Sequence, residues 1–172
     1  MDTRSSLTRK LLGAAVFGGL TILTATLGAR AARKGKGRWY RQLEKPALTP
    51  PDRVFSVVWR VLYPLIAISG YRVWKRGDGR SRRRALGLWG TQLALNAAWT
   101  PLFFARRRFR AAMVNVVALL AATAAYTRQA RRMDKRAPLL MAPYLAWIAF
   151  ATYLNAEILR RNRGKLPSSR ST

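Results

Sequence analysis

The chain has 172 residues, of which 50% are hydrophobic, and its formal net charge is +27. It contains no cysteine and no histidine, which excludes disulfides, thiol catalysis, thiolate metal sites and imidazole ligands or bases. A polybasic nucleic-acid-binding protein would spread Lys and Arg along its helix faces, whereas here they are absent from long stretches and clustered between them, so no nucleic-acid partner is expected.

The uncharged stretches predict helices that cross a membrane. Four stretches carry no charged residue: 11–29, 85–105, 111–127 and 137–156. A bilayer core of roughly 30 Å takes about 20 residues of helix, so each is long enough or nearly so. A fifth span, 54–74, contains Arg72 near one end, where it can snorkel, and Arg60, which is costlier to bury. The sequence therefore predicts an all-α membrane protein with a five-transmembrane-helix bundle.

One transmembrane domain is expected over residues 1–162, followed by a disordered basic tail over 163–172. In chain order, the helices are expected at about 10–30, 50–74, 83–105, 108–128 and 137–161. A long loop, 31–49, joins the first two helices. The other joints are short, so the second to fifth helices should run up and down as neighbours.

Local features refine these helices. The charge order of the first helix is that of a signal peptide, but its apolar run is too long, so we interpret it as a retained helix. Thr49 is expected to cap the second helix, with Pro50 in its first turn. Pro64 and Pro101 should kink the helices that contain them, which neighbouring helices tolerate.

Acidic residues offer little chemistry. There are six of them, and none lies deep in a predicted span, which argues against a proton-coupled pump. Glu157 is expected to pair with Arg160 or Arg161 at helical spacing.

Polar and aromatic side chains inside the spans are more informative. Gln92 and Asn96 share one face of the third helix, and Trp99 lies a turn further on. The amides either bond across helices as structural glue or, with Trp99, face a cavity. Trp59, Trp99 and Trp147 lie inside spans rather than at interfaces, and an aromatic-lined pocket suits a flat apolar ligand.

Small residues also follow the third helix at four-residue spacing, which permits close approach of another helix within the bundle or in a dimer. They are Gly87, Thr91, Ala94 and Ala98. Lys and Arg are balanced between the two sets of joints, so the sequence does not predict an orientation.

Three segments resemble the translocator protein family, also called tryptophan-rich sensory proteins or peripheral-type benzodiazepine receptors. The first contains Trp39, Tyr40, Leu43, Lys45, Pro46, Pro50, Pro51, Val58, Trp59, Leu62 and Tyr63. The second contains residues 92–96, Trp99, Pro101, Phe103 and Phe104. The third contains residues 143–147, Phe150, Ala151, Thr152, Leu154 and Asn155. They occur in the family's order and span most of the chain.

The resemblance implies a five-helix bundle whose inter-helical pocket is covered by the loop 31–49. It implies binding of porphyrins such as protoporphyrin IX and haem, with no required cofactor, and a homodimer, for which the third helix is the candidate contact. The implied ligand-binding residues are Tyr40, Pro51, Trp59, Asn96, Trp99, Trp147, Ala151 and Leu154. No catalytic or metal-binding residue is implied. Ala156 stands where the animal cholesterol-recognition pattern has an aromatic residue, so cholesterol binding is not expected.

We therefore expect an integral membrane tetrapyrrole-binding protein that regulates or transports porphyrin, in a bacterial cell membrane. Two alternatives remain. One is an enzyme that degrades porphyrin in light, with tryptophan taking part, since acid–base and nucleophilic catalysis lack their usual groups. The other is a transporter of porphyrin or another apolar ligand, although five helices offer no inverted repeat.

Overall fold

The computed structural model describes residues 3–35 and 37–162, which form helices joined by short loops, without a strand among them. The elements are α1 (Thr3–Gly35), α2 (Arg38–Gln42), α3 (Asp52–Arg76), α4 (Gly79–Thr100), the π-helical segment η1 (Pro101–Ala105), α5 (Phe109–Ala130) and α6 (Ala137–Arg161). The predicted basic tail, 163–172, lies outside the described residues. Helix α1 begins earlier and ends later than expected, and the predicted third helix is divided into α4 and η1.

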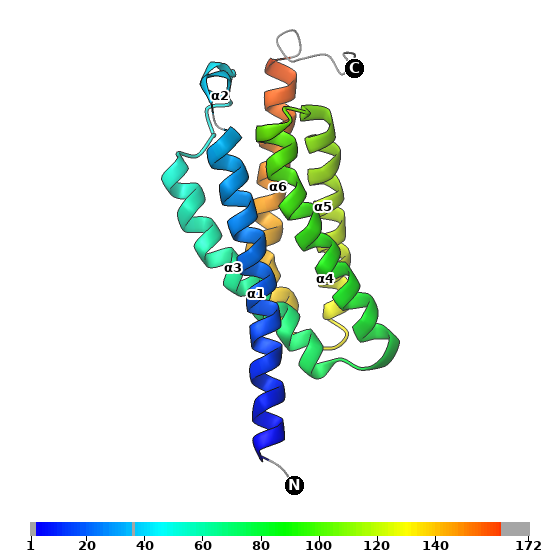
Figure 1. Cartoon of the computed structure of the whole chain (residues 1–172). Coiled ribbons are helices and arrows are strands. Elements are labelled where there is room, and N and C mark those ends of the chain that lie inside the picture. Colours follow the sequence, from blue (N-terminus) through cyan, green and yellow to red (C-terminus); the bar gives the residue numbers. More distant parts are fainter. Residues whose placement is uncertain (1–2, 36, 163–172) are drawn as a thin grey trace.

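The five long helices stand side by side in one bundle (Figure 1). Helix α1 packs against α3, α4 and η1, while α6 packs against α3 and α5, and α5 against α4. These contacts close a ring in the order α1, α3, α6, α5, α4. Although α3 and α4 are consecutive in the chain, α1 contacts each of them more extensively than they contact each other.

The two ends of the bundle differ. The loop end holds α2, η1, the start of α3 and the end of α6 (Figure 1). The opposite end, which we call the N-terminal end, holds the start of α1, the joint 77–78 and the joint 131–136. The beginning of the chain and the end of α6 thus lie at opposite ends of the bundle.

Four described helices are long and apolar enough to cross a membrane: α1, α3, α5 and α6. Helix α4 falls short because arginines occupy its first two turns and its apolar stretch continues into η1. The prediction of an all-α membrane protein is confirmed, whereas the count of five spans is not.

Apolar side chains cover the outside of the bundle, and several polar ones lie inside. Leu11, Val114 and Leu139 are each more than half exposed, at 61%, 71% and 70%. Gln92 and Thr123, by contrast, are fully buried. Interhelical packing in membranes favours this arrangement, because acyl chains solvate outward apolar groups while polar groups find partners inside.

The N-terminal end contains an ion pair between a half-buried arginine and a buried aspartate. Arg72 Nε lies 2.7 Å from Asp134 Oδ2, and Arg72 Nη2 donates to Asp134 Oδ1 at 3.1 Å. The backbone N–H of Arg136 donates to Oδ1 at 2.9 Å. Arg72, which lies near enough to the helix end to snorkel, ties α3 to the joint between α5 and α6. Arg60, the other arginine of this span, is exposed on α3.

The start of α3 differs from the expectation. The residue preceding its first turn is Pro51, and the prediction that Thr49 caps the helix is wrong. The Thr49 hydroxyl instead donates to Pro46 O at 2.7 Å, and its backbone N–H bonds to the same oxygen at 2.9 Å. Because the turn at Pro46 engages Thr49, its hydroxyl is not available to the helix.

A glycine permits the crossing of α1, α3 and α4. A Cβ at Gly70 would lie 2.6 Å from Trp89 ring atoms and 2.8 Å from Phe17 Cδ1. The Trp89 indole N–H donates to Ile66 O at 3.0 Å, and the rings of Phe17 and Trp89 meet edge to face with centroids 4.8 Å apart. The three helices therefore approach closely only because position 70 lacks a side chain.

Candidate ligand-binding site

The topology gathers the eight predicted ligand-binding residues toward the loop end. Helix α3 begins at that end, so Pro51 and Trp59 lie near it, and α4 and α6 finish there. Trp147 lies near the middle of α6 and is the deepest of the set. The others are Tyr40 on α2, Asn96 and Trp99 in the last two turns of α4, and Ala151 and Leu154 on the second half of α6.

Tyr40 and Trp99 meet in an aromatic cluster beneath the loop. Trp99 stacks on Phe103 with ring centroids 5.2 Å apart and an interplanar angle of 21°. Tyr40 meets Phe104 edge to face at 5.2 Å and lies 5.8 Å from Trp39. Phe103 and Phe104 are buried. The π-helical segment after Pro101 therefore presents two adjacent rings to the loop, and π-helical turns are frequent at functional sites.

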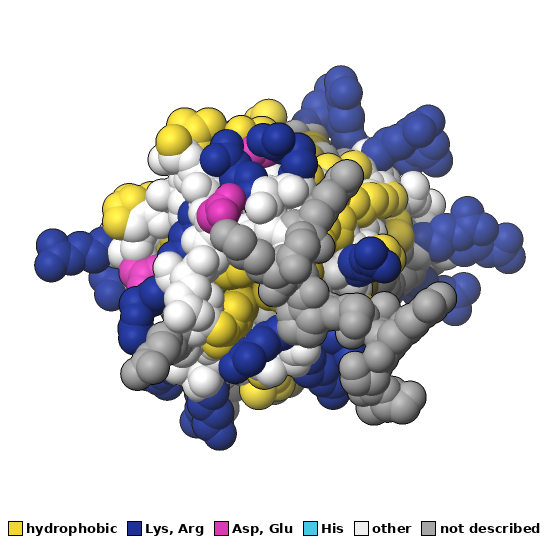
Figure 2. Space-filling view, turned by 90° about the horizontal axis from the view of Figure 1, so that it is seen from above, with side chains coloured by type: hydrophobic (Ala, Val, Ile, Leu, Met, Phe, Trp, Pro, Cys, Tyr) yellow, Lys and Arg dark blue, Asp and Glu magenta, His cyan; other side chains and the backbone are white. Residues whose placement is uncertain are grey.

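Cations lie on the aromatic faces of this cluster. Lys45 Nζ is 4.2 Å from the centroid of the Tyr40 ring, and Arg107 Cζ is 5.2 Å from that of Trp39, within the range of cation–π attraction. Arg107 has a positive φ of 52°, an uncommon conformation for a residue other than glycine. Figure 2, viewed from above, shows Lys and Arg side chains projecting around the outline of the molecule.

The Trp99 indole N–H is buried and has no hydrogen-bond acceptor. A buried donor without a partner costs about 1–3 kcal/mol, and such groups are uncommon in folded proteins. The aromatic cluster therefore holds one donor that a ligand oxygen or ring nitrogen can satisfy.

Asn96 and Trp59 meet in a second group, deeper in the bundle. Asn96 Nδ2 donates to the Tyr144 hydroxyl at 2.8 Å, and the Tyr63 hydroxyl donates to Asn96 Oδ1 at 3.2 Å. Trp59 stacks on Tyr63 with centroids 4.8 Å apart. The Asn96 amide thus joins α3, α4 and α6, as the structural-glue interpretation expects. Gln92 differs, because both of its polar atoms are buried without a partner.

The tyrosines that hold Asn96 were not among the predicted site residues. Tyr63 and Tyr144 both lie within the segments that carry the family resemblance. Their position in those segments was the available indication, but sequence spacing does not reveal that they converge on one amide from two helices.

Trp147 lines an apolar groove between α3 and α6. The groove has a volume of about 440 Å³ and is lined by Val57, Val58, Val61, Leu62, Pro143, Ala146, Trp147 and Phe150. Phe55 meets Trp147 edge to face at 5.3 Å. Such a groove offers flat apolar walls within the 300–1,000 Å³ range that is typical of ligand pockets, at about its lower end.

The remaining predicted residues lie outside these groups. Pro51 is exposed before the first turn of α3. Ala151 is half-buried, and its carbonyl accepts from Asn155 Nδ2 at 2.8 Å, while Leu154 is buried. The eight residues therefore share the loop half of the bundle but do not line one common cavity in this structure.

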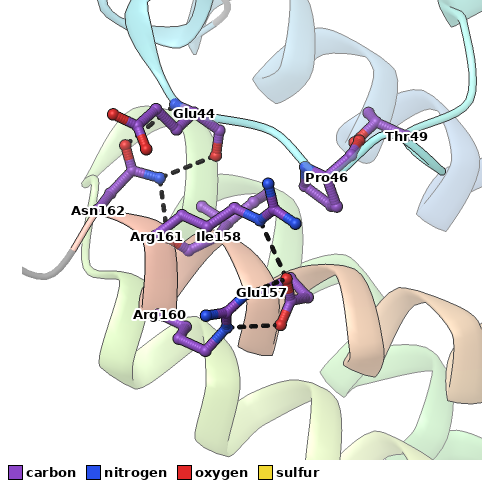
Figure 3. Close-up of polar contacts among 8 residues, drawn as sticks. All are labelled: Glu44, Pro46, Thr49, Glu157, Ile158, Arg160, Arg161 and Asn162. Atoms are coloured by element: carbon purple, nitrogen blue, oxygen red, sulfur yellow. Dashed lines mark hydrogen bonds and ion pairs between the residues drawn. The ribbon is translucent and has the colours of Figure 1, made fainter.

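Asn162 fastens the loop to the end of α6 (Figure 3). Its Oδ1 accepts from the Glu44 backbone N–H at 3.0 Å, and its Nδ2 donates to Glu44 O and to Ile158 O, each at 2.9 Å. Asn162 is 1% exposed. This pair of reciprocal bonds holds the segment that follows Tyr40 against the bundle.

The same close-up shows the predicted pairing of Glu157 (Figure 3). Arg160 Nε lies 2.8 Å from its Oε1 and Arg161 Nε 3.0 Å from its Oε2. The expectation of a local ion pair is confirmed, with both arginines taking part. Across residues 3–35 and 37–162, no group of three or more Asp or Glu side chains is placed to hold a metal ion.

Comparison with known proteins agrees with the resemblance. The model of the TspO/MBR family matches residues 16–161. Translocator protein of Homo sapiens is 41% identical over 133 residues, covering 76% of this chain and 79% of the human protein. Tryptophan-rich sensory protein of Cereibacter sphaeroides is 38% identical over 125 residues, covering 72% and 77%. Protein CrtK of Rhodobacter capsulatus is 34% identical over 149 residues, covering 85% and 92%. The chain belongs to the TspO/MBR family and is an integral, multi-pass membrane protein.

Proposed function

We propose that this protein binds a tetrapyrrole, protoporphyrin IX or haem, within the membrane and thereby regulates or transports porphyrin. The observation that carries the proposal is the aromatic cluster beneath the loop, where Tyr40 and Trp99 meet two buried phenylalanine rings. Its unpaired Trp99 indole N–H supplies a donor for a polar group of the ligand.

The chemistry of a tetrapyrrole fits these surroundings. Its flat apolar face gains free energy by leaving contact with water, at about 25 cal/mol per Å² of buried surface, and aromatic rings add specific stacking. Its propionates are anions, and Lys45 and Arg107 lie at the cluster. The groove beside Trp147 offers a second apolar wall, open between α3 and α6.

We propose further that the bundle crosses the membrane five times, with α4 and η1 together forming the fifth span. An odd number of crossings agrees with the opposite positions of the chain start and the end of α6 (Figure 1). Ala94 is exposed and Ala98 is half-buried on the second half of α4, which favours a homodimer through that part of the helix. The host is proposed to be a bacterial cell membrane.

A fluorescence titration tests the ligand and its site. Protoporphyrin IX added to the purified full chain should quench tryptophan emission, and the double variant Trp99→Phe/Trp147→Phe should bind more weakly, by about tenfold for a loss of 1.4 kcal/mol of stacking and burial. Trp74→Phe is the matched control, because Trp74 lies in the last turn of α3 at the N-terminal end.

Two results would contradict the proposal. If the parent protein shows no saturable quenching, the ligand class is wrong. If the double variant and Trp74→Phe titrate like the parent, the ligand binds elsewhere. Uptake of porphyrin into vesicles that contain the protein then separates transport from binding alone.

A further inference from the structure

A second groove, unrelated to the loop end, lies between α4 and α5. It has a volume of about 490 Å³ and is lined by Arg84, Gly87, Leu88, Thr91, Ala125, Arg128, Gln129 and Arg132. Arg84 lies in the second turn of α4, and Arg128 and Arg132 lie at and just beyond the last turn of α5. The three arginines therefore lie toward the N-terminal end of the bundle, where α4 begins and α5 ends (Figure 1), away from the proposed tetrapyrrole site.

The three arginines of the groove are not neutralised by the protein. In the described part of the chain, the ion pairs to carboxylates involve Arg72, Arg76, Arg160 and Arg161, and none involves a groove arginine. Arg128 in the last turn of α5 and Arg132 just beyond it line the same groove, so their like charges repel each other. An anion bound between them and Arg84 would relieve that repulsion.

The groove changes from charged to apolar along its length. Thr91 follows Arg84 by two turns of α4, or about 10 Å at 1.5 Å per residue. Between them, Gly87 and Leu88 form the floor on α4, and Ala125 forms it on α5. The charged mouth thus lies at the end of the bundle, where lipid head groups lie, and the apolar floor leads toward the middle of the membrane.

We propose that this groove binds an anionic phospholipid. The phosphate lies among Arg84, Arg128 and Arg132, and the glycerol and the first acyl carbons lie on the floor beside Gly87 and Ala125. Arginine suits this role because its planar guanidinium donates two parallel hydrogen bonds to phosphate oxygens. Basic pockets between transmembrane helices bind anionic lipid head groups in other proteins.

Charge favours this occupant over a second copy of the chain. A copy that covered the groove through the same surface would bring three more arginines against these three. The groove beside Trp147 offers a comparison within the same molecule, because its lining carries no charged residue. That groove can accept an acyl chain but cannot distinguish an anionic from a zwitterionic head group.

Electron paramagnetic resonance of spin-labelled lipids tests the proposal. The full chain is reconstituted in phosphatidylcholine bilayers that contain spin-labelled phosphatidylglycerol or spin-labelled phosphatidylcholine, and the motionally restricted fraction gives the relative affinity. The parent should prefer phosphatidylglycerol. The triple variant Arg84→Gln/Arg128→Gln/Arg132→Gln should lose about a hundredfold in relative affinity for phosphatidylglycerol, since each of the three basic residues near a membrane surface contributes about 1 kcal/mol.

Two matched variants separate the groove from general charge. Arg80→Gln/Arg83→Gln/Arg131→Gln removes three exposed arginines from the same end of the bundle, outside the groove lining, and should keep the preference. Gly87→Leu fills the groove without changing charge; a Cβ there meets nothing within 4 Å, so the fold should tolerate it. This variant should lose most of the preference.

Three outcomes would overturn the proposal. Equal losses in both arginine triples would mean that net charge alone attracts the lipid. Competition by soluble glycerol 3-phosphate at millimolar concentration would mean that a free phosphate, rather than a lipid, is the ligand. A Gly87→Leu variant that keeps the preference but changes the oligomeric state would mean that a second copy covers the groove.

Discussion

Gly70 lies where α1, α3 and α4 cross, and its lack of a Cβ allows the three helices to pack closely. A Cβ at this position would lie 2.6 Å from the Trp89 ring, which is itself held by its bond to Ile66 O. Gly70→Ala should therefore destabilise the protein by about 1–3 kcal/mol, the usual cost of overpacking a core, and should lower the midpoint of thermal unfolding in detergent.

Gly90→Ala is the control for this prediction. Gly90 is also inside a helix, but a Cβ there meets nothing within 4 Å. Alanine stabilises a helix interior relative to glycine by about 1 kcal/mol, so the midpoint should stay the same or rise. Equal shifts in both variants would show that Gly70 does not limit the packing.

Asp134 makes stability depend on pH. Burial raises the pKa of this carboxyl, but the hydrogen bonds from Arg72 and from the Arg136 backbone N–H outweigh burial and hold the pKa below its ordinary value. The folded state thus favours the carboxylate. Its stabilising contribution is complete above the unfolded-state pKa of about 4 and is lost as pH falls through the lower folded-state pKa.

Asp134→Asn should therefore lower the unfolding midpoint at neutral pH, because a hydrogen bond to a charged group contributes about 1.5–3 kcal/mol. The difference between parent and variant should shrink as the pH falls below about 4. Asp78→Asn, which changes an exposed carboxyl, should behave like the parent. A constant difference at all pH values would mean that Asp134 contributes by packing and not by charge.

The side chain of Asn162 holds the loop between α2 and α3 against the end of α6. Asn162→Ala removes both reciprocal bonds to Glu44. At a net contribution of about 1 kcal/mol for each of the two hydrogen bonds, amide hydrogen exchange over residues 43–49 should become about thirtyfold faster. The measurement is exchange followed by mass spectrometry on the detergent-solubilised protein.

Glu157→Gln provides the comparison for the loop. It breaks the ion pairs with Arg160 and Arg161, which lie on α6 and not in the loop, so exchange over residues 43–49 should not change. If Asn162→Ala leaves exchange unchanged as well, the loop is held by its apolar contacts and not by this side chain.

The division of the predicted third helix shows what sequence can and cannot tell about an element. Pro101 lacks a backbone N–H, so a disturbance at that position could be predicted. The structure resolves it as a π-helical segment in which the Arg106 N–H donates to Pro101 O at 2.9 Å. This choice of register depends on how Phe103 and Phe104 pack against the loop, which sequence spacing does not contain.

For the whole molecule, the four apolar helices α1, α3, α5 and α6 could be predicted because charge is excluded from a bilayer one segment at a time. The predicted count of five spans is not confirmed, because arginines occupy the first two turns of α4. The order of helices in the ring was not. Helix α1 lies against both α3 and α4 because Gly70 admits Trp89 and Phe17, residues far apart in the chain. The Arg72–Asp134 pair, which joins residues 62 positions apart, was inaccessible for the same reason.

The sequence named the candidate ligand-binding residues, but it did not predict how they are arranged relative to one another. The segments that carry the family resemblance named Trp59, Asn96 and Trp99, and the chain direction of α3, α4 and α6 brings them to one half of the bundle. Their division between two aromatic groups depends on Tyr63 and Tyr144, which bind the Asn96 amide from two helices.

The arrangement of the helices in the ring also affects how the bundle assembles during biosynthesis. Among the described helices, α6 is synthesised after the others, yet it supplies partners for groups that enter the membrane earlier: Tyr144 for the Asn96 amide and the Ala137 carbonyl for the Ser69 hydroxyl. Until α6 arrives, these polar groups face lipid without these partners, at a cost of several kcal/mol for each. A bundle that lacks α6 is therefore less stable than the complete one, and a chain truncated before α6 should be a substrate for membrane quality control.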